Sequence, residues 1–322
     1  MKRMLMLLVS LILAGAGAQA SAQAYPTKPI RLVVGFTPGG AADFVARAIA
    51  EPLSKALGQA VIVENRPGAG SSIAADYVAK SAPDGYTMLI ASPSSISVNP
   101  ALNSKLGYSL RDLAPITKVS TSPLLITAYP GLGVNSIKEL IAVAKKSPGK
   151  LNYSSSGNGS APHLAGVLFS RLAGVDMVHV PFKGGGPSVQ SVLAGDTQLT
   201  FATPPSVLPL VQSGRLRALA VTSRKSTPLV PGVPGMEEAG LPDYEISFWY
   251  GFFVPAATKP EIVKKLFDAT IAALQRPEVK QAFAREGTEV ASSSSPADFA
   301  AFLAENDKLW VRLVRESGAK ID

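Results

Sequence analysis

The sequence contains no cysteine and only two histidines in 322 residues. Without cysteine the chain can form no disulfide, no thiolate metal site and no cysteine-linked lipid anchor. Two isolated histidines give no convincing transition-metal cluster, so we expect neither a metal nor a cofactor. Basic residues outnumber acidic ones, 31 against 23, but they are scattered, which argues against nucleic-acid binding. The positive charge either attracts anions or serves only solubility.

The sequence also lacks an apolar run of the roughly 20 residues that a membrane-spanning helix needs. Its most apolar stretch, residues 5–14, is shorter, follows Lys2 and Arg3, and leads into A-x-A patterns that end at Ala20, Ala22 and Ala24. This layout is typical of a cleaved secretory signal. We therefore predict a periplasmic protein cleaved after Ala22 or Ala24; an uncleaved membrane anchor is the alternative.

A mature chain of roughly 300 residues is large enough for two lobes. Apolar, β-rich runs alternate with amphipathic helical patterns, which indicates an α/β fold. The order of elements predicts that the chain leaves the first lobe near Tyr129 and returns near Ile246. Lobe 1 would then comprise residues 25–129 and 246–322, and lobe 2 residues 130–245. Two hinge crossings between lobes imply a cleft that can close on a ligand.

Two segments share a strand–glycine–helix pattern. Residues 30–36 predict a buried strand that runs into Thr37-Pro38-Gly39-Gly40-Ala41, and residues 151–154 predict a strand that runs into residues 155–160 (SSGNGS). Each pattern places a small loop at a helix N-terminus, where unpaired N–H groups bind anions. The alternative is that both are plain strand-to-helix turns. If one such loop lies on each lobe, the pair would hold a carboxylate across the cleft.

Enzyme hypotheses find less support. His163 lies close in sequence to Ser155, Ser156 and Ser160, which would suit a Ser–His hydrolase, but there is no G-x-S-x-G elbow. The glycine-rich stretches lack the G-K-[ST] ending of a P-loop and the G-x-G-x-x-G spacing of a dinucleotide site. We therefore expect no enzymatic activity.

Several spaced motifs make the chain resemble the Bug family, the substrate-binding receptors of tripartite tricarboxylate transporters. The motifs are residues 25–40 (YPTKPIRLVVGFTPGG) with Asp43, 63–70 (VENRPGAG), 83–87 (PDGYT), 151–160 (LNYSSSGNGS), 179–184 (HVPFKG) and 249–251 (WYG). The resemblance implies a type II periplasmic-binding-protein fold with two lobes and a cleft. It also implies a carboxylate ligand, held by backbone amides, hydroxyls and bridging waters.

The resemblance also implies which residues bind the ligand. They form a first-lobe loop, a neighbouring serine loop, a second-lobe loop and two flanking residues: Phe36, Pro38, Gly39, Gly40, Ala41, Asp43, Ser92, Ser94, Ser155, Ser156, Gly157, Asn158, Ser160, Lys183 and Gly184. The chain departs from many relatives at Thr203, where they carry Asp. An Asp there could pair with a ligand ammonium, whereas Thr203 cannot carry that charge, so carboxylates without an amino group are favoured.

The sequence thus predicts a monomeric periplasmic receptor that passes a small carboxylate, by preference a dicarboxylate, to membrane transporter subunits. Two other functions stay open: a ligand sensor for a signalling partner, and the Ser–His hydrolase. Of Trp249 and Tyr250, we expect one to line the cleft and the other to lie in the core.

Overall fold

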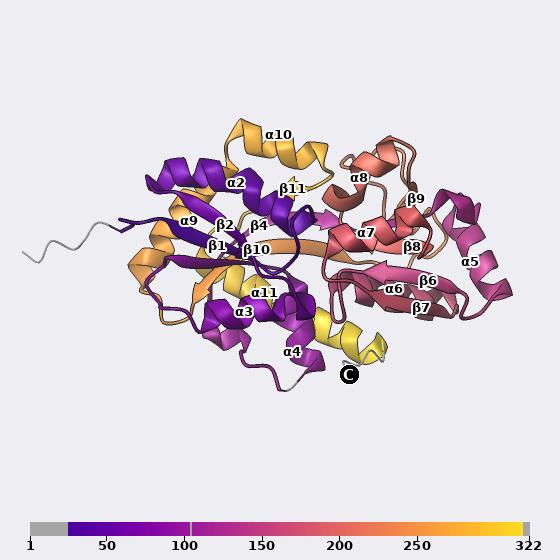
Figure 1. The fold of residues 1–322 in the computed structure, drawn as a ribbon, viewed down its shortest axis with the longest axis horizontal. Coiled ribbons are helices and arrows are strands. Elements are labelled where there is room, and N and C mark those ends of the chain that lie inside the picture. Colours follow the sequence, from indigo (N-terminus) through magenta and orange to yellow (C-terminus); the bar gives the residue numbers. More distant parts are fainter. Residues whose placement is uncertain (1–24, 104, 318–322) are drawn as a thin grey trace, which may run out of the picture.

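The structure of the protein is a computed structural model that describes residues 25–103 and 105–317. The predicted signal segment lies outside the described residues. Two sheets form the centres of two lobes, which lie side by side along the long axis (Figure 1). The predicted two-lobed α/β fold is confirmed. Within the described ranges, every helix is too short or too polar to cross a membrane.

The first lobe is built on a six-stranded sheet in the order β11-β4-β10-β3-β1-β2. Its strands are β1 (Ile30–Val34), β2 (Val61–Asn65), β3 (Thr87–Ala91), β4 (Leu113–Pro123), β10 (Ser247–Pro255) and β11 (Glu289–Val290). Its helices are α2 (Ala41–Leu57), α3 (Ser72–Ala79), α4 (Asn99–Leu102), α9 (Pro260–Leu274), α10 (Pro277–Arg285) and α11 (Pro296–Ser317), with the short turns η1 (Ala69–Ser71), η2 (Ser94–Val98) and η3 (Leu110–Asp112). β1 runs parallel to β2 and β3, and β10 lies antiparallel between β3 and β4.

The second lobe is built on a five-stranded sheet in the order β7-β6-β8-β5-β9. Its strands are β5 (Leu125–Ala128), β6 (Leu151–Ser155), β7 (Met177–Pro181), β8 (Leu199–Ala202) and β9 (Arg217–Val221). Its helices are α5 (Ile137–Lys146), α6 (Ala161–Ala173), α7 (Gly185–Ala194) and α8 (Pro204–Gln212), with the turn η4 (Pro130–Leu132).

Strand β5 corrects the predicted crossing point. The predicted boundary at Tyr129 assigns this strand to lobe 1, but it pairs antiparallel with both β8 and β9 of the second sheet. The chain therefore leaves the first sheet at Pro123, before β5 rather than after it. The chain returns to the first sheet where β10 begins, at Ser247.

The sequence of β1 explains how the first lobe is layered. Its residues are almost all apolar because helices cover both faces of a largely parallel sheet. Leu32 and Val34 pack into the core cluster that contains α2, whereas Val33 packs on the opposite face with α3. The strand ends where Gly35 and Phe36 turn the chain into α2, and this turn borders the cleft.

Both crossings are tied to one residue, Thr222, which is fully buried at the end of β9. Its amide donates to the carbonyl of Leu124, whose own amide donates to Thr222 Oγ1 at 2.7 Å. Thr222 Oγ1 donates to the carbonyl of Ile246, and Ile246 N–H donates to the carbonyl of Thr222. The outgoing and returning segments therefore share a single anchoring residue.

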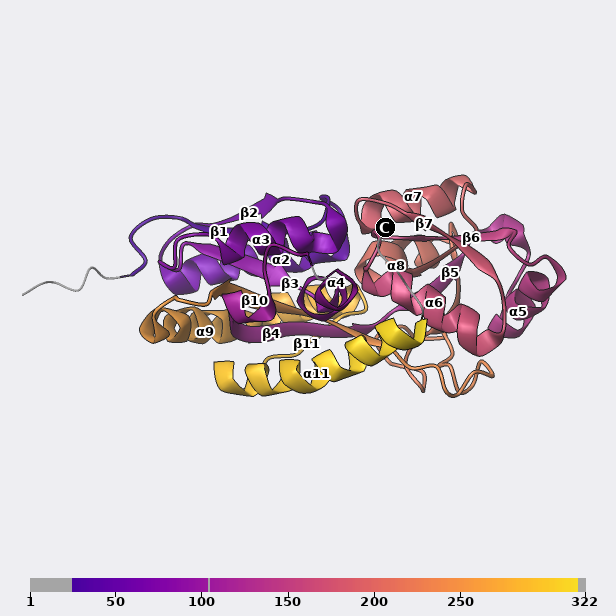
Figure 2. The same cartoon turned by 90° about the horizontal axis from the view of Figure 1, so that it is seen from below.

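Helix α11 makes a further connection between the lobes. It packs on β4 and η2 of the first lobe and continues to α6 of the second (Figure 2). Trp310, Leu313 and Val314 are buried in the large core cluster, and Trp310 Nε1 donates to Asn306 Oδ1. The core is therefore continuous past the hinge on this side.

Candidate ligand-binding site

A small cavity, here the first cavity, lies between the lobes, and its volume is about 30 Å³. Its lining comes from both lobes: Phe36, Gly40, Ala41, Ala42, Ser94, Ser156, Pro162, Gly185, Ser188, Thr200, Ala202, Thr203, Ser206, Phe248 and Tyr250. The lobes touch beside it, since Ala161 N–H on α6 donates to Ser94 Oγ across the cleft at 3.0 Å. The cleft is therefore closed.

Helix α2 presents its N-terminus to this cavity. Gly40 is the N-cap residue in an extended conformation with no side-chain cap, and Gly40, Ala41 and Ala42 line the cavity. The amides of these three residues have no hydrogen-bond partner in the described part of the chain. A free first turn of a long helix attracts anions through its N–H groups and its dipole. The first-lobe loop therefore presents free amides at the wall of the first cavity.

Asp43 shapes this loop rather than lining the cavity. Its carboxylate accepts from Arg47 Nε at 2.9 Å, from Asn65 Nδ2 at 3.0 Å and from the Gly39 amide at 3.1 Å. Burial alone would raise the pKa of Asp43, but the hydrogen bonds from Arg47, Gly39 and Asn65 outweigh it and hold the pKa below its usual value. The ion pair with Arg47 compensates the negative charge of Asp43, so this carboxylate does not repel an anion at the start of α2.

Helix α7 faces α2 from the other lobe. The backbone amides of Gly185 and Gly186 lie 3.8 Å from where a Cβ on Gly40 would be. Neither amide has a partner among the described residues, and the first backbone bond of this helix runs from Ser188 to Gly184. The two free helix starts that oppose each other are therefore those of α2 and α7.

The predicted second-lobe loop, residues 155–160, is largely occupied by its own hydrogen bonds. Ser160 caps α6 by accepting from the His163 amide at 3.3 Å, and the Ala161 amide is bound to Ser94. Ser156 lines the first cavity, while Gly157 and Asn158 line a neighbouring one. Of this loop, Ser156 is the residue best placed to meet a ligand in the first cavity.

Hydroxyl groups line the second-lobe side of the cavity. Ser188, Thr200 and Ser206 lie there with Thr203, the N-cap residue of α8. Thr203 Oγ1 and Ser206 Oγ are 3.3 Å apart. Thr203 therefore lies at the cavity, and no acidic side chain occurs among the described residues that line it.

Strand β10 forms the remaining wall. Phe248 and Tyr250 line the cavity, whereas Trp249 points to the opposite face of the strand, packs against Phe299 and donates from Nε1 to Asn306 Oδ1. Alternation along the strand puts these neighbours on opposite faces. The Tyr250 hydroxyl has no hydrogen-bond partner among the described residues, and burial raises the pKa of Tyr250. Tyr250 is thus the residue of the pair that lines the cleft, and its neutral hydroxyl is a free donor.

The two histidines, His163 and His179, hold the second-lobe loop in place. Their rings stack with centroids 3.9 Å apart and an angle of 17° between planes. His179 Nε2 lies 2.6 Å from Ser155 Oγ, and the Gly159 amide donates to His163 Nδ1 at 3.3 Å. Burial lowers the pKa of His163 to about 4, and burial together with the charge of His163 lowers that of His179 to about 3. Both rings are neutral at pH 7 and fasten the loop at two points.

The Ser155–His179 contact resembles a nucleophile and its base, but its surroundings do not suit hydrolysis. Ser155 is fully buried, and its hydroxyl also lies 3.1 Å from both the amide and the carbonyl of Gly157. No carboxylate accepts a bond from His179 among the described residues, and a strongly lowered pKa makes it a weak base. The contact is therefore suited to holding the loop.

The remaining predicted residues lie at different distances from the first cavity. Ser92 is fully buried, its hydroxyl has no partner, and it does not line the cavity. Gly184 packs against Thr37 of the first lobe, and the carbonyl of Pro38 lies near Gly186. Lys183 is exposed and lines the neighbouring cavity. Gly39 contributes its amide to Asp43.

Sequence reasoning missed several lining residues. They are Ala42, Pro162, Gly185, Ser188, Thr200, Ala202, Ser206 and Phe248. Two of the segments that contain these residues carry a sequence signal. Residues 177–186 and 198–206 each have a strand followed by small residues and a helix start, which is the same pattern as in the two loops predicted to bind the ligand. No group of three or more potential metal ligands occurs in the part of the chain that the structure describes.

Two α/β lobes, two hinge crossings and a closed cleft lined by helix N-termini define a solute-binding protein. Residues 45–319 match the tripartite tricarboxylate transporter family receptor. The chain is 38% identical over 310 residues to the protein BugT of Bordetella pertussis, covering 96% of this chain and 95% of that one. The chain therefore belongs to the tripartite tricarboxylate transporter receptor family, among its Bug proteins.

Solved structures of similar proteins support this family assignment. The structure of Rpa4515 from R. palustris with adipate has a TM-score of 0.88, at 34% identity, and covers 92% of this chain and all of that one. The structure of MatC from Rhodopseudomonas palustris with bound malate has a TM-score of 0.85, at 30% identity, and covers 90% of this chain and all of that one. The protein is a carboxylate-binding receptor of a transport system.

Proposed function

We propose that this receptor captures a dicarboxylate without an amino group in the periplasm and delivers it, unchanged, to the membrane subunits of its transporter. The observation that carries this is the pair of free helix starts, α2 and α7, that face each other across the first cavity. Amides and a helix dipole bind an anion without a formal cation. A ligand carboxylate between them would engage both lobes at once.

The lining supports an anion and argues against an amino acid. An ammonium group needs a carboxylate or several acceptors, and Thr203 and Ser206 offer only neutral hydroxyls. The Tyr250 hydroxyl adds a donor on the wall formed by β10. Adipate and malate, which are named in the structures of two similar proteins, are both dicarboxylates with no amino group.

Ligand binding would favour the closed state in proportion to its contacts with both lobes. A ligand shifts a two-state equilibrium only through its different affinities for the two states. In this proposal the monomeric closed receptor is what the transporter recognises, and the ligand leaves chemically intact. The N-terminal signal would deliver the protein to the periplasm and be cleaved there.

Calorimetry with a panel of mono-, di- and tricarboxylates and matching amino acids tests the proposal. We expect one dicarboxylate per chain to bind most tightly and aspartate or glutamate to bind much more weakly than succinate or glutarate. An ester-hydrolysis assay on the same preparation should show no turnover. Tighter binding of an amino acid, or turnover that His179→Gln abolishes, would contradict the proposed function.

A further inference from the structure

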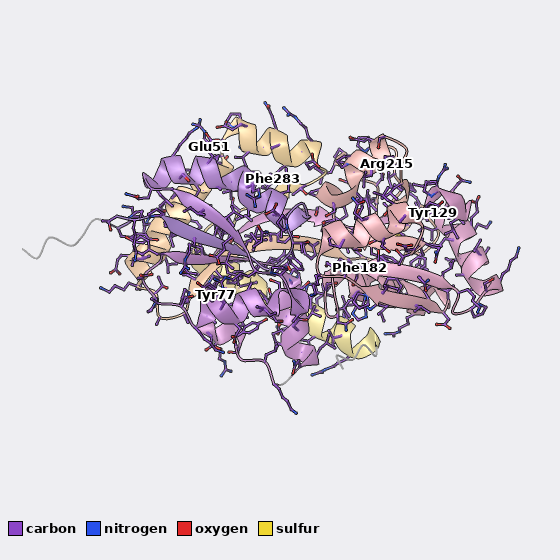
Figure 3. All side chains as sticks on the ribbon, viewed as in Figure 1. Glu51, Tyr77, Tyr129, Phe182, Arg215 and Phe283 are labelled. Atoms are coloured by element: carbon purple, nitrogen blue, oxygen red, sulfur yellow. The ribbon has the colours of Figure 1, made fainter. Side chains whose placement is uncertain are left out.

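A second cavity adjoins the first along the seam between the lobes. Its volume is about 210 Å³, and it shares Phe36 and Ser156 with the first. The first lobe contributes the turn Gly68–Ser71, and the second lobe contributes Gly157, Asn158, Phe182 and Lys183. Figure 3 shows Phe182 on the side of the second lobe that faces the first.

The volumes of the two cavities differ in what they can hold. A water-sized group needs roughly 10–15 Å³ of cavity. The first cavity, at about 30 Å³, therefore holds a group of carboxylate size and little more in this closed cleft. The second, at about 210 Å³, has room for the rest of a small organic acid. The shared residues Phe36 and Ser156 mark the passage between them.

The second cavity differs from the first in charge. Among the described residues that line the two cavities, Lys183 alone carries a formal charge. It makes no ion pair within the described ranges. An unpaired cation at a cavity wall is free to pair with a ligand anion.

The backbone beside Lys183 is also shaped for close approach. Ala69, Gly70 and Ser71 all have positive φ, at 46°, 58° and 75°, which is a strained conformation for Ala69 and Ser71. A Cβ on Gly70 would lie 2.9 Å from the carbonyl of Asn158, so only glycine lets the lobes meet here. The strained turn forms a wall of the second cavity when the cleft is closed.

We propose that the second cavity is the subsite for the distal carboxylate of the ligand and that Lys183 is its counter-charge. One carboxylate lies between the starts of α2 and α7, the carbon chain passes Phe36 and Ser156, and the second carboxylate reaches Lys183. This rests on the proposed function and adds which residue distinguishes a dicarboxylate from a monocarboxylate.

The test measures affinity and dissociation rate for pairs of equal chain length: succinate and butyrate, glutarate and pentanoate, adipate and hexanoate. Lys183→Gln should weaken the best dicarboxylate about three- to tenfold and leave its monocarboxylate partner unchanged, as expected for loss of one partly exposed charged contact. Lys183→Glu should weaken the dicarboxylate further. Lys150→Gln is the matched control, because Lys150 is exposed and precedes β6 at the end away from the cleft.

The dissociation rate separates a subsite from electrostatic steering. Removing a contact made in the complex raises the dissociation rate, whereas removing a steering charge lowers the association rate. We expect the change in the dissociation rate. A change confined to the association rate, or an equal loss for both members of a pair, would overturn the subsite while leaving the receptor function intact. If the native protein bound no carboxylate at all, the proposed function would fall, and the subsite with it.

Discussion

The stacked pair formed by His163 and His179 should make the stability of the receptor fall in mild acid. Both rings are neutral in the folded protein, with pKa values lowered to about 4 and about 3, against 6.5 for a free histidine. Between pH 6.5 and about 4 the unfolded chain therefore binds more protons than the folded one. The contribution of the two neutral rings to the free energy of unfolding is therefore fully present above pH 6.5. It is lost as the pH falls towards the lowered pKa values.

The size of the effect follows from linkage. Each histidine that is charged in the unfolded state and neutral in the folded state removes up to about 1.4 kcal/mol per pH unit. From pH 6.5 to 4.5, we expect the pair to remove about 4 kcal/mol from the free energy of unfolding. A domain is typically stable by about 5–15 kcal/mol, so the loss is easily measured.

The double variant His163→Asn, His179→Gln tests this reasoning. Asn offers an oxygen near Nδ1 for the Gly159 amide, and Gln offers a polar atom near Nε2 for Ser155, but neither titrates. Urea unfolding at pH 6.5, 5.5 and 4.5 gives the stability of both proteins. We expect the native protein to lose about 4 kcal/mol more than the variant over this range. Equal losses would show that the slope does not come from the two histidines and that this reasoning is wrong.

Two further predictions concern the cleft and the N-terminus. A Cβ on Gly40 would point towards the amides of Gly185 and Gly186, 3.8 Å away. Gly40→Leu should therefore hold the lobes apart and weaken binding about 100-fold or more, while keeping the native thermal midpoint without ligand. Full affinity in Gly40→Leu would remove the α2 start from the site. Mass spectrometry of periplasmic protein should find a chain that begins at Gln23 or Tyr25; an intact N-terminus in the membrane fraction would contradict the predicted cleavage.

Much of the fold could be predicted because each lobe repeats a simple pattern. The apolar runs predicted β1 and β6 close to their observed bounds. Strand β4 was missed because Pro115, Lys118 and several hydroxyl residues interrupt its apolar character; it is a strand because β10 and β11 pair with it on either side. The sheet to which β5 belongs was also misjudged, since an apolar run of four residues reads the same in either lobe.

The strand–glycine–helix patterns predict two helix starts at the cleft, those of α2 and α6. The start of α2 lines the first cavity, whereas the opposing free start is that of α7, which was not predicted. Which starts have free amides depends on partners distant in sequence, such as Ser94 for the amide of Ala161. Likewise, alternation along β10 separates Trp249 from Tyr250, but only the packing of Trp249 against Phe299 shows which face is the core.

The shared anchor at Thr222 has a consequence for how the receptor communicates. Because the outgoing segment at Leu124 and the returning segment at Ile246 are bonded to the same residue, neither can bend alone. We expect the two lobes to rotate relative to each other about a single hinge axis at this shared anchor. Phe248 and Tyr250 line the first cavity and lie on strand β10, which follows Ile246 directly. A membrane partner that contacts both lobes would then recognise one angle between them, whichever carboxylate is bound.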